Sequence, residues 1–430
     1  MELRAKMSKA GESMIKVKKL DCGITLIMEN IPYVQSASLG IWSKTGSVDE
    51  TKKYAGISHL IEHMIFKGTE KRSAKQIAED VDKIGSHINA FTGKEATCYY
   101  IKTLASNIDK SIEILLDMFL NSVFAKNELE KEKHVIYEEM KMIEDSPEDD
   151  IHDIICELVF KGDPLSQTII GTKSSLSRIT GDSIKKYIFN EYTRNSVVIS
   201  VAGKFNEEHL VKLIGGKLSG LNEAKSKKTC EYNPYTTSFK VKVKDIEQAH
   251  VCLGTRGVKL DDKNYYAFTV LNNIFGGTMS ARLFQSIRED KGLAYSVYSA
   301  SNSFIDMGVF SIYAAVSHDK ARETVIAVRD ELMKLKKDGI SEDELSAAKE
   351  QLKGSYIFSQ ESVSGRMFSI GKNMTLLGKI FTPEEVIAGI DKVTRDDIEE
   401  VSEQINRFEN YSAVLITNRR ADLSKWMKEQ

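Results

Sequence analysis

Two histidines four residues apart, with a glutamate between them, form the arrangement in this sequence that is best suited to chemistry. They lie in the stretch AGISHLIEHMIFKGT as His59, Glu62 and His63. On a helix, positions four apart share one face, so both imidazoles can reach a single metal ion. Glu62 flanks the same face, where it could take a proton from a water molecule at the metal without binding the ion itself.

A third ligand must come from elsewhere, because a catalytic zinc ion takes three protein ligands and leaves one position open. The stretch EKEKHVIYEEMKMIEDSPED carries Glu132 and Glu139 seven residues apart, two helical turns, so they share a face. Glu138 points about 100° away from Glu139. We interpret Glu139 as the third ligand and Glu132 as a carboxylate that orients a histidine. On spacing alone, a solvated acidic face and a histidine pair without a ligand role both stay open as alternatives.

The second half of the chain repeats features of the first half. IFGGT, behind a helical stretch that begins near Tyr265, resembles IFKGT behind the histidine helix, and ISEDELSAAKEQ resembles FAKNELEKEKHV. At the same offset, the second half carries other residues: Phe268 for His59, Leu271 for Glu62 and Asn272 for His63. The second copy therefore indicates that a helix at this place does not need histidines for its packing. A duplication favours a chemical role for the histidines, and it predicts that the second half cannot bind metal in the same way.

The surrounding residues predict alternating strands and helices. Strands are expected in GITLIMENI, SASLGIWSKTG and VVISVAG, and a hairpin is expected in SHINAFTGKEATCYYIK with its turn at Thr92 to Lys94. Helices are expected from Tyr54 to Phe66 and over a long region from about Ser106 to Met142.

A chain of 430 residues is too long for one ordinary core, so we expect two domains. The polar stretch 221–237 lacks periodicity and contains Pro234, which favours a linker. The predicted domains are residues 1–220, which carry the metal ligands, and residues 238–430, the copy without them.

Composition excludes several classes of function. Sixty basic and 62 acidic side chains give a formal charge of −2, so nothing in the balance suggests nucleic acid or an anionic membrane as a partner. Five scattered cysteines without a CxxC pattern argue for a reducing compartment. The opening residues lack the apolar core of a secretory signal, and no later run approaches the ~20 apolar residues of a membrane span. We expect a soluble, cytoplasmic protein, with an organellar matrix as the less favoured alternative.

HxxEH is the signature of inverted zincins, and with it the sequence resembles the pitrilysin family of zinc peptidases. Within that family it is similar to the catalytic subunit of mitochondrial processing peptidase and its bacterial single-unit relatives. The resemblance covers nearly the whole chain and rests on five stretches: GSVDE, HLIEHMIFKGT, NAFT, EKHVIYEEM and REDKGLAYSVYS. It implies that Glu139 is the third ligand of one zinc ion per chain. It also implies roles for Arg288 and Tyr295, which match an arginine and a tyrosine that the family uses.

The implied activity is endopeptidase hydrolysis. Glu62 would act as general base, Tyr295 would stabilise the oxyanion, and Arg288 would hold the substrate backbone or carbonyl. Without the resemblance, Arg288 would be interpreted as a solvated charge and Tyr295 as a half-buried strand aromatic. An extended peptide could add to an edge strand in the NAFT segment, which makes these residues substrate-binding candidates: Asn89, Ala90, Phe91 and Thr92. A purely structural hairpin is the alternative for that segment.

We therefore expect an α+β protein of two homologous domains, each a mostly antiparallel sheet covered by helices, forming one half of a clamshell chamber. The resemblance implies a homodimer whose enclosed site admits short or unfolded peptides. A non-catalytic peptide-binding or scaffolding subunit of the same family is the alternative, and a metal-sensing or metal-storage module is a third hypothesis.

Other histidines and glycines are expected to have no ligand role. Gly276 and Gly277 predict a turn or a substrate-side loop rather than nucleotide binding. Six histidines occur singly: His87, His134, His152, His209, His250 and His318.

Overall fold

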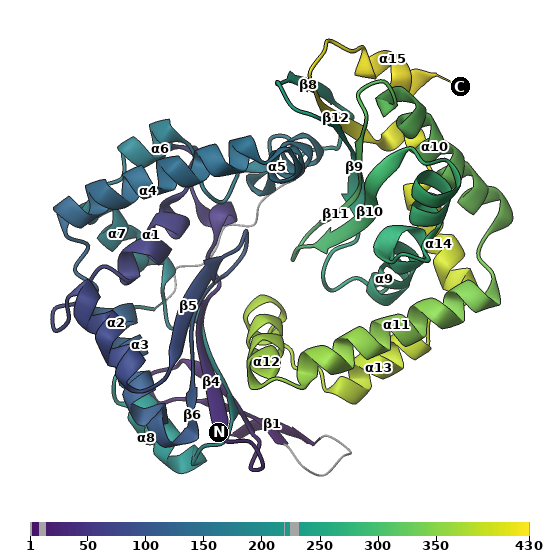
Figure 1. The fold of residues 1–430 in the computed structure, drawn as a ribbon. Helices are drawn as coiled ribbons and strands as arrows, with labels where there is room; N and C mark the ends of the chain where they lie inside the picture. The colour runs from purple at the N-terminus through teal and green to yellow at the C-terminus, as the bar shows by residue number, and fades with distance from the viewer. Residues whose placement is uncertain (1, 8–13, 219, 224–231, 430) are drawn as a thin grey trace. The chain divides into compact units, whose positions relative to one another are not determined.

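The computed structural model describes residues 2–7, 14–218, 220–223 and 232–429. They form two compact units, each built on one sheet (Figure 1). The first unit has three segments: Met1–Met140, Gln167–Cys230 and Tyr356–Val386. The second unit also has three: Lys141–Ser166, Glu231–Ser355 and Ile387–Gln430. Each unit therefore contains a segment from the opposite half of the sequence. The expected linker, 221–237, includes residues 224–231, which lie outside the described residues.

The sheet of the first unit has seven strands in the order β1-β2-β3-β7-β4-β6-β5. Only β3 and β7 are parallel neighbours, and the other pairs are antiparallel. The expected hairpin is β5–β6, with its turn between Thr92 and Thr97, and it places β5 at the sheet edge. The strand bounds are β1 Glu2–Met7, β2 Met14–Lys19, β3 Thr25–Asn30, β4 Ser36–Ser43, β5 His87–Thr92, β6 Thr97–Leu104 and β7 Val197–Gly203.

Both helical stretches expected in the first half of the sequence are present, with two differences, and the first unit contains further helices that were not predicted. The histidine helix begins three residues later than expected, and the long region after Ser106 divides near Phe124, whose φ of 53° interrupts helical geometry. The helix bounds are α1 Ile57–Ile65, α2 Ala74–Lys83, α3 Ile108–Asn121, α4 Lys126–Asp145, α6 Lys173–Ser177, α7 Gly181–Glu191, α8 Glu207–Gly215 and α12 Val363–Leu377. The last residues of α4, from Lys141, belong to the second unit.

Helices cover both faces of this sheet. Neighbouring residues of a strand point to opposite faces. Tyr99 contacts Phe119 of α3, with ring centroids 5.8 Å apart, and Tyr100 contacts Phe368 of α12 at 4.8 Å. Helix α12, which follows the first sheet by more than 150 residues in sequence, thus packs on the face opposite α3.

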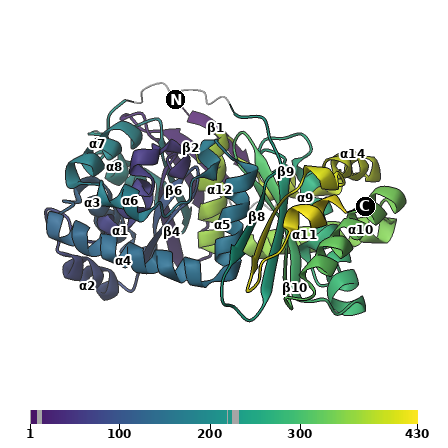
Figure 2. The ribbon, with the colours of Figure 1, turned by 90° about the horizontal axis from the view of Figure 1, so that it is seen from above.

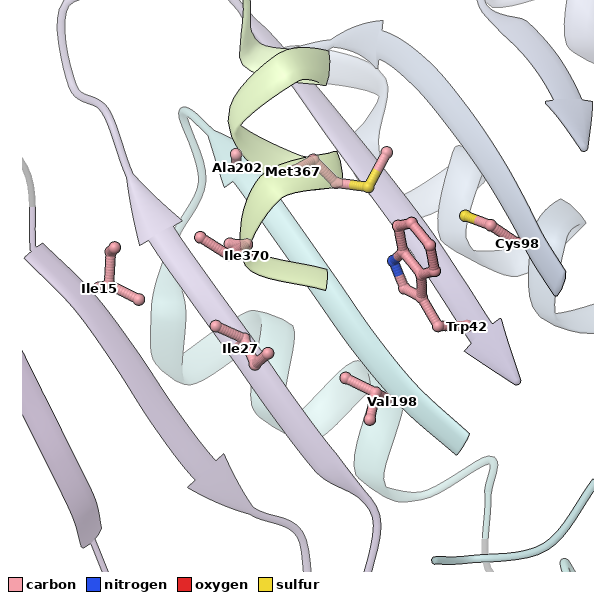
Figure 3. Packing of buried hydrophobic residues seen from close by; sticks show 8 residues of the cluster. All are labelled: Ile15, Ile27, Trp42, Cys98, Val198, Ala202, Met367 and Ile370. Atoms are coloured by element: carbon pink, nitrogen blue, oxygen red, sulfur yellow. The ribbon is translucent and has the colours of Figure 1, made fainter. Parts of the chain in front are cut away.

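Trp42 lies at the centre of the contact between α12 and the sheet (Figure 3). Its indole N–H donates to the Ser200 hydroxyl at 2.9 Å. A Cβ at Gly371 of α12 would lie 2.1 Å from the indole nitrogen, so only glycine allows this close approach. Met367 and Ile370 of the same helix are buried in the cluster.

The second unit is built on a five-stranded sheet in the order β10-β11-β9-β12-β8. Helix α5 (Pro147–Val159) packs on β9 and β12 (Figure 2). The strands are β8 Phe239–Val243, β9 Ala249–Gly257, β10 Ala294–Ser303, β11 Gly308–Val316 and β12 Ser412–Thr417. The remaining helices are α9 Tyr265–Asn272, α10 Ala321–Asp338, α11 Glu342–Gln360, α13 Pro383–Asp391, α14 Arg395–Ile405 and α15 Leu423–Lys428. Part of α11 and part of α13 belong to the first unit.

The two sheets repeat one topology. The order β3-β7-β4-β6-β5 corresponds strand by strand to β8-β12-β9-β11-β10, including the single parallel pair. Gly40 of β4 and Gly254 of β9 occupy matching positions, because a Cβ there would meet Met367 of α12 at 2.6 Å or Ile155 of α5 at 2.5 Å. Each sheet is therefore covered on one face by a helix from the opposite half of the sequence. The expected α+β class, with mostly antiparallel sheets covered by helices, is confirmed.

Within the described part of the chain, no helix is long and apolar enough to cross a membrane. The four described cysteines carry free thiols: Cys22, Cys98, Cys156 and Cys252.

Candidate metal centre

Helix α1 is fixed at its start by a glycine and a buried carboxylate. Gly56 has a φ of +89°, and a Cβ there would lie 2.6 Å from the carbonyl oxygen of Ile170, so other residues are disfavoured. Glu50 accepts hydrogen bonds from the N–H groups of Gly56 at 2.6 Å and Ser58 at 2.8 Å. A carboxylate in this place satisfies amides that the helix leaves unpaired and complements its dipole.

The apolar residues of α1 determine which side chains face outward. Five of them are buried against the core, namely Ile57, Leu60, Ile61, Met64 and Ile65. His59, Glu62 and His63 remain half-buried on the other side of the helix.

Helix α4 brings Glu139 to the two histidines. Leu129, Ile136 and Met140 anchor this helix in the core. Glu139 Oε1 lies 3.8 Å from His59 Nε2, and Glu139 Oε2 lies 3.7 Å from His63 Nε2. One ligand atom from each of the three residues lies within 4.8 Å of the other two.

These three residues fit a zinc ion. Ligand atoms about 2.0–2.2 Å from a tetrahedral zinc stand roughly 3.4 Å apart, slightly closer than the two distances from Glu139 to the imidazoles. Glu139 Oε2 is buried without a hydrogen-bond partner, which is costly unless a cation compensates it. Burial, with a smaller contribution from His63, lowers the pKa of His59 to about 4, so its imidazole is neutral near pH 7 as a metal ligand must be.

Glu132 orients His63. Its Oε2 lies 3.2 Å from His63 Nδ1, and its Oε1 lies 2.7 Å from Lys67 Nζ. If Nδ1 donates to this carboxylate, the lone pair of Nε2 faces Glu139. Sequence reasoning found Glu132 and missed Lys67. The available signal was its position four residues after His63, one turn along the same face.

Glu62 stands beside the proposed ligands and has one partner from the sheet. The Thr92 hydroxyl donates a hydrogen bond to Glu62 Oε2. Burial raises the pKa of Glu62, and the bond from Thr92 offsets part of that rise. A carboxylate whose proton affinity is raised in this way is suited to general-base chemistry.

The substrate-binding candidates lie on β5, which is an edge strand and contacts α1. Asn89 Oδ1 accepts from the Ala90 N–H at 2.8 Å. Phe91 is 40% exposed and packs edge-on against Trp42, with ring centroids 5.7 Å apart. Thr92 is directed to Glu62, as described above. Outward-facing main-chain groups of an edge strand can pair with an extended peptide.

Arg288 and Tyr295 lie in the second unit and contact each other. The Arg288 guanidinium lies 5.2 Å from the ring centroid of Tyr295 and 4.6 Å from that of Phe284. Tyr295 is 75% exposed. The helical segment Phe284–Asp290, which carries Arg288, is held by the Ser286 hydroxyl, which donates to Glu331 of α10 at 2.6 Å. The structure thus places nine candidates in the first unit and this pair in the second.

Helix α9 occupies the matching place in the second unit and has no ligands at the corresponding positions. Phe268 and Leu271 are buried in the core. Asn272 accepts a hydrogen bond from the Ser299 hydroxyl at 2.9 Å. The glycines that follow, Gly276 and Gly277, lie in the helical turn Asn273–Gly277. Four of the single histidines have partners of their own: Asp109 for His209, Tyr298 for His152, Tyr313 for His250 and Thr417 for His318.

Comparisons with known families identify both halves of the chain. A family model described as insulinase, peptidase family M16, matches residues 25–173, and one described as peptidase M16 inactive domain matches residues 178–352. The uncharacterized zinc protease YmxG of Bacillus subtilis is 42% identical over 93% of this chain and 98% of its own length. An uncharacterized zinc protease of Rickettsia felis is 37% identical over 94% of this chain and 97% of its own.

Two solved structures share the fold. A protease from Helicobacter pylori covers 94% of this chain and 99% of its own, with a TM-score of 0.85 at 22% identity. A protein from Pseudomonas fluorescens, described as a peptidase M16 inactive domain, covers 95% of this chain and 98% of its own, with a TM-score of 0.88 at 18% identity.

Proposed function

Because the chain belongs to peptidase family M16, the pitrilysin family, we propose that it is a zinc-dependent endopeptidase that hydrolyses short or unfolded peptides. The observation that carries the proposal is the convergence of His59, His63 and Glu139, whose ligand atoms lie within 4.8 Å of one another. We assign one zinc ion per chain to these residues.

The protein residues have separate tasks in the proposed reaction. Zinc, when bound, supplies Lewis-acid polarisation of the scissile carbonyl and lowers the pKa of water. Glu62 takes a proton from the attacking water and returns it to the leaving amine. Tyr295 donates a hydrogen bond to the developing oxyanion, and Arg288 holds the substrate carbonyl or backbone. Glu132 keeps His63 in the required tautomer.

Substrate binding is proposed to use the edge of the first sheet. A peptide that adds to β5 gains main-chain hydrogen bonds, which give affinity with little sequence selectivity. The proposed main-chain contacts come from Asn89, Ala90, Phe91 and Thr92, and the Phe91 side chain adds exposed aromatic surface.

The proposal also covers the domain organisation, the oligomeric state and the cellular compartment. Residues 1–220 are proposed as the catalytic half and residues 238–430 as the duplicated half, joined by 221–237, with α12 and α5 exchanged between the compact units that they build. The two domains form one half of a clamshell chamber that a homodimer completes in the cytoplasm. Enclosure would restrict substrates to chains that can enter unfolded.

The test measures metal content and hydrolysis of a mixed, unstructured peptide pool on the same purified protein, with and without chelator. Glu62→Gln should keep zinc and lose cleavage. Glu139→Gln should lose both, because it removes a ligand charge. Glu138→Gln, an exposed neighbour on the same helix, is the matched control and should change neither.

Three results would count against the proposal. Zinc lost in Glu62→Gln would refute the division of roles between base and ligands. Equal effects in Glu138→Gln and Glu139→Gln would refute the ligand assignment. Zinc bound by the wild type without cleavage would favour the non-catalytic peptide-binding or scaffolding subunit, and the oligomeric state in solution would then be measured next.

A further inference from the structure

Thr92 is the residue of β5 that reaches the centre of the site. It is the last residue of the edge strand, and its half-buried side chain faces α1. Its hydroxyl donates to Glu62 Oε2, as described above. Its cross-strand partner is Thr97 in β6, whose own hydroxyl donates to the Thr45 carbonyl at 2.9 Å.

A glutamate that acts as a base must be held in one orientation. Its side chain has three rotatable bonds, and proton transfer needs the accepting oxygen within about 2.6–3.2 Å of the attacking water. A hydroxyl donor at Oε2 fixes the plane of the carboxylate, and the Thr92 backbone N–H adds a second hydrogen bond to Glu62. Threonine suits this task, because its β-branched side chain is restricted at χ1.

We propose that Thr92 is a positioning residue that holds Glu62 in its reactive orientation, and that its side chain does not act as a substrate contact. The inference rests on the proposed function, because it assigns Thr92 to the base of that reaction. It also ties two parts of the site together. The strand that would pair with a substrate main chain ends in the residue that orients the base, so substrate and base share one support.

The test compares Thr92→Val, Thr92→Ser and wild type in steady-state hydrolysis of one peptide. Valine keeps the shape of threonine and removes the donor, whereas serine keeps the donor. Thr92→Val should lower kcat by about 10- to 100-fold with KM within about twofold, because displacing a catalytic group by about 1 Å costs on this order. Thr92→Ser should retain at least about a third of kcat. Zinc content should be unchanged in both.

Thr97→Val is the matched control. It makes the same substitution in the paired strand, where the hydroxyl bonds a backbone carbonyl and does not contact Glu62. Its kcat and KM should stay near those of the wild type once thermal stability shows that it folds. A fall in kcat equal to that of Thr92→Val would overturn the proposal.

Two other results for Thr92→Val would also overturn the proposal. A raised KM with an unchanged kcat in Thr92→Val would overturn the proposal in favour of a substrate contact. Loss of zinc in Thr92→Val would overturn it in favour of a role in the metal site.

A structural measurement that does not depend on catalysis can test the role of Thr92 even if the proposed function fails. If the wild type does not cleave peptides, the proposed function fails, and crystal structures of the zinc-loaded wild type and Thr92→Val still test the hydroxyl. A Glu62 carboxylate that rotates or takes several conformers in the variant supports positioning by Thr92. An unchanged carboxylate overturns it.

Discussion

Glu132 is a buried carboxylate whose two oxygens meet two different side chains. Oε2 lies 3.2 Å from His63 Nδ1 and Oε1 lies 2.7 Å from Lys67 Nζ, and only 5% of the residue is exposed. Lys67 compensates the charge that burial would otherwise make costly. The pair therefore places a largely buried acceptor, with a cation beside it, against His63.

Removing that acceptor should weaken zinc binding without removing a ligand. Glu132→Ala is expected to lower zinc affinity by about 10- to 100-fold, the range found when partners of metal-bound histidines are replaced. Competition with a chelator of known affinity measures the change, and Glu138→Ala on the same helix serves as control. Equal affinity in the two variants would show that Glu132 does not orient His63.

Site residues that share one helix could be predicted from the sequence, whereas contacts between separate elements could not. His59, Glu62 and His63 share one helix, and Glu132 shares another with Glu139, so helical spacing relates the members of each group. Lys67 follows a helix end, and its meeting with Glu132 depends on how α1 packs against α4. Thr92 meets Glu62 only because β5 packs beside α1. The spacing from His63 places Lys67 near the site, but no local spacing expresses these contacts between elements.

At the scale of elements, α1 depends on a carboxylate from outside the helix. Glu50 precedes the helix, is 6% exposed, and accepts from two of its first amides. Burial raises the pKa of Glu50 from 4.5 to about 7, more than the two backbone hydrogen bonds lower it. The carboxyl group therefore takes up a proton in the folded protein at a higher pH than in the unfolded chain.

This difference predicts a pH dependence of stability. The contribution of the Glu50 carboxyl to stability is fully present below pH 4.5, its pKa in the unfolded chain. It is lost as pH rises through about 7, its pKa in the folded protein. The wild type minus Glu50→Gln difference in unfolding free energy should fall by roughly 3 kcal/mol between pH 4.5 and 8. Denaturant unfolding of the metal-free proteins measures it.

Glu70→Gln, at an exposed glutamate beyond the same helix, provides the control and should show no comparable change. A wild type minus Glu50→Gln difference that is constant with pH would mean that folding does not raise the pKa of Glu50.

At the scale of the whole molecule, each half of the sequence supplies a helix to the sheet of the other half, so neither half is a complete folding unit. Residues 1–220 contain the first sheet without α12, and residues 238–430 contain the second sheet without α5. The repeat in the sequence indicated two halves, and the repeated sheets agree with it. Sequence could not indicate the exchange, because the apolar face of a helix does not specify which of two similar sheets it will cover.

Fragments cut between the halves should therefore not fold alone. Without α12, the face around Ile27, Trp42 and Val198 is uncovered, and each such side chain forfeits about 1.5–3 kcal/mol of burial. The fragments 1–220 and 238–430 are expected to aggregate separately and to form a soluble complex when co-expressed, as judged by size-exclusion chromatography. A full chain with a protease site placed in 221–237 should stay associated after cleavage. A soluble, cooperatively unfolding fragment 1–220 would contradict this expectation.

The late position of α12 also matters while the protein is being made. The last strand of the first sheet, β7, ends at Gly203, whereas α12 begins at Val363, roughly 160 residues later. At about 5–20 residues per second, a ribosome needs on the order of 10 to 30 seconds to make that stretch. For that time the Trp42 face of the nascent sheet has no cover. Translation of this chain thus leaves an apolar surface of the first sheet uncovered until α12 has been made.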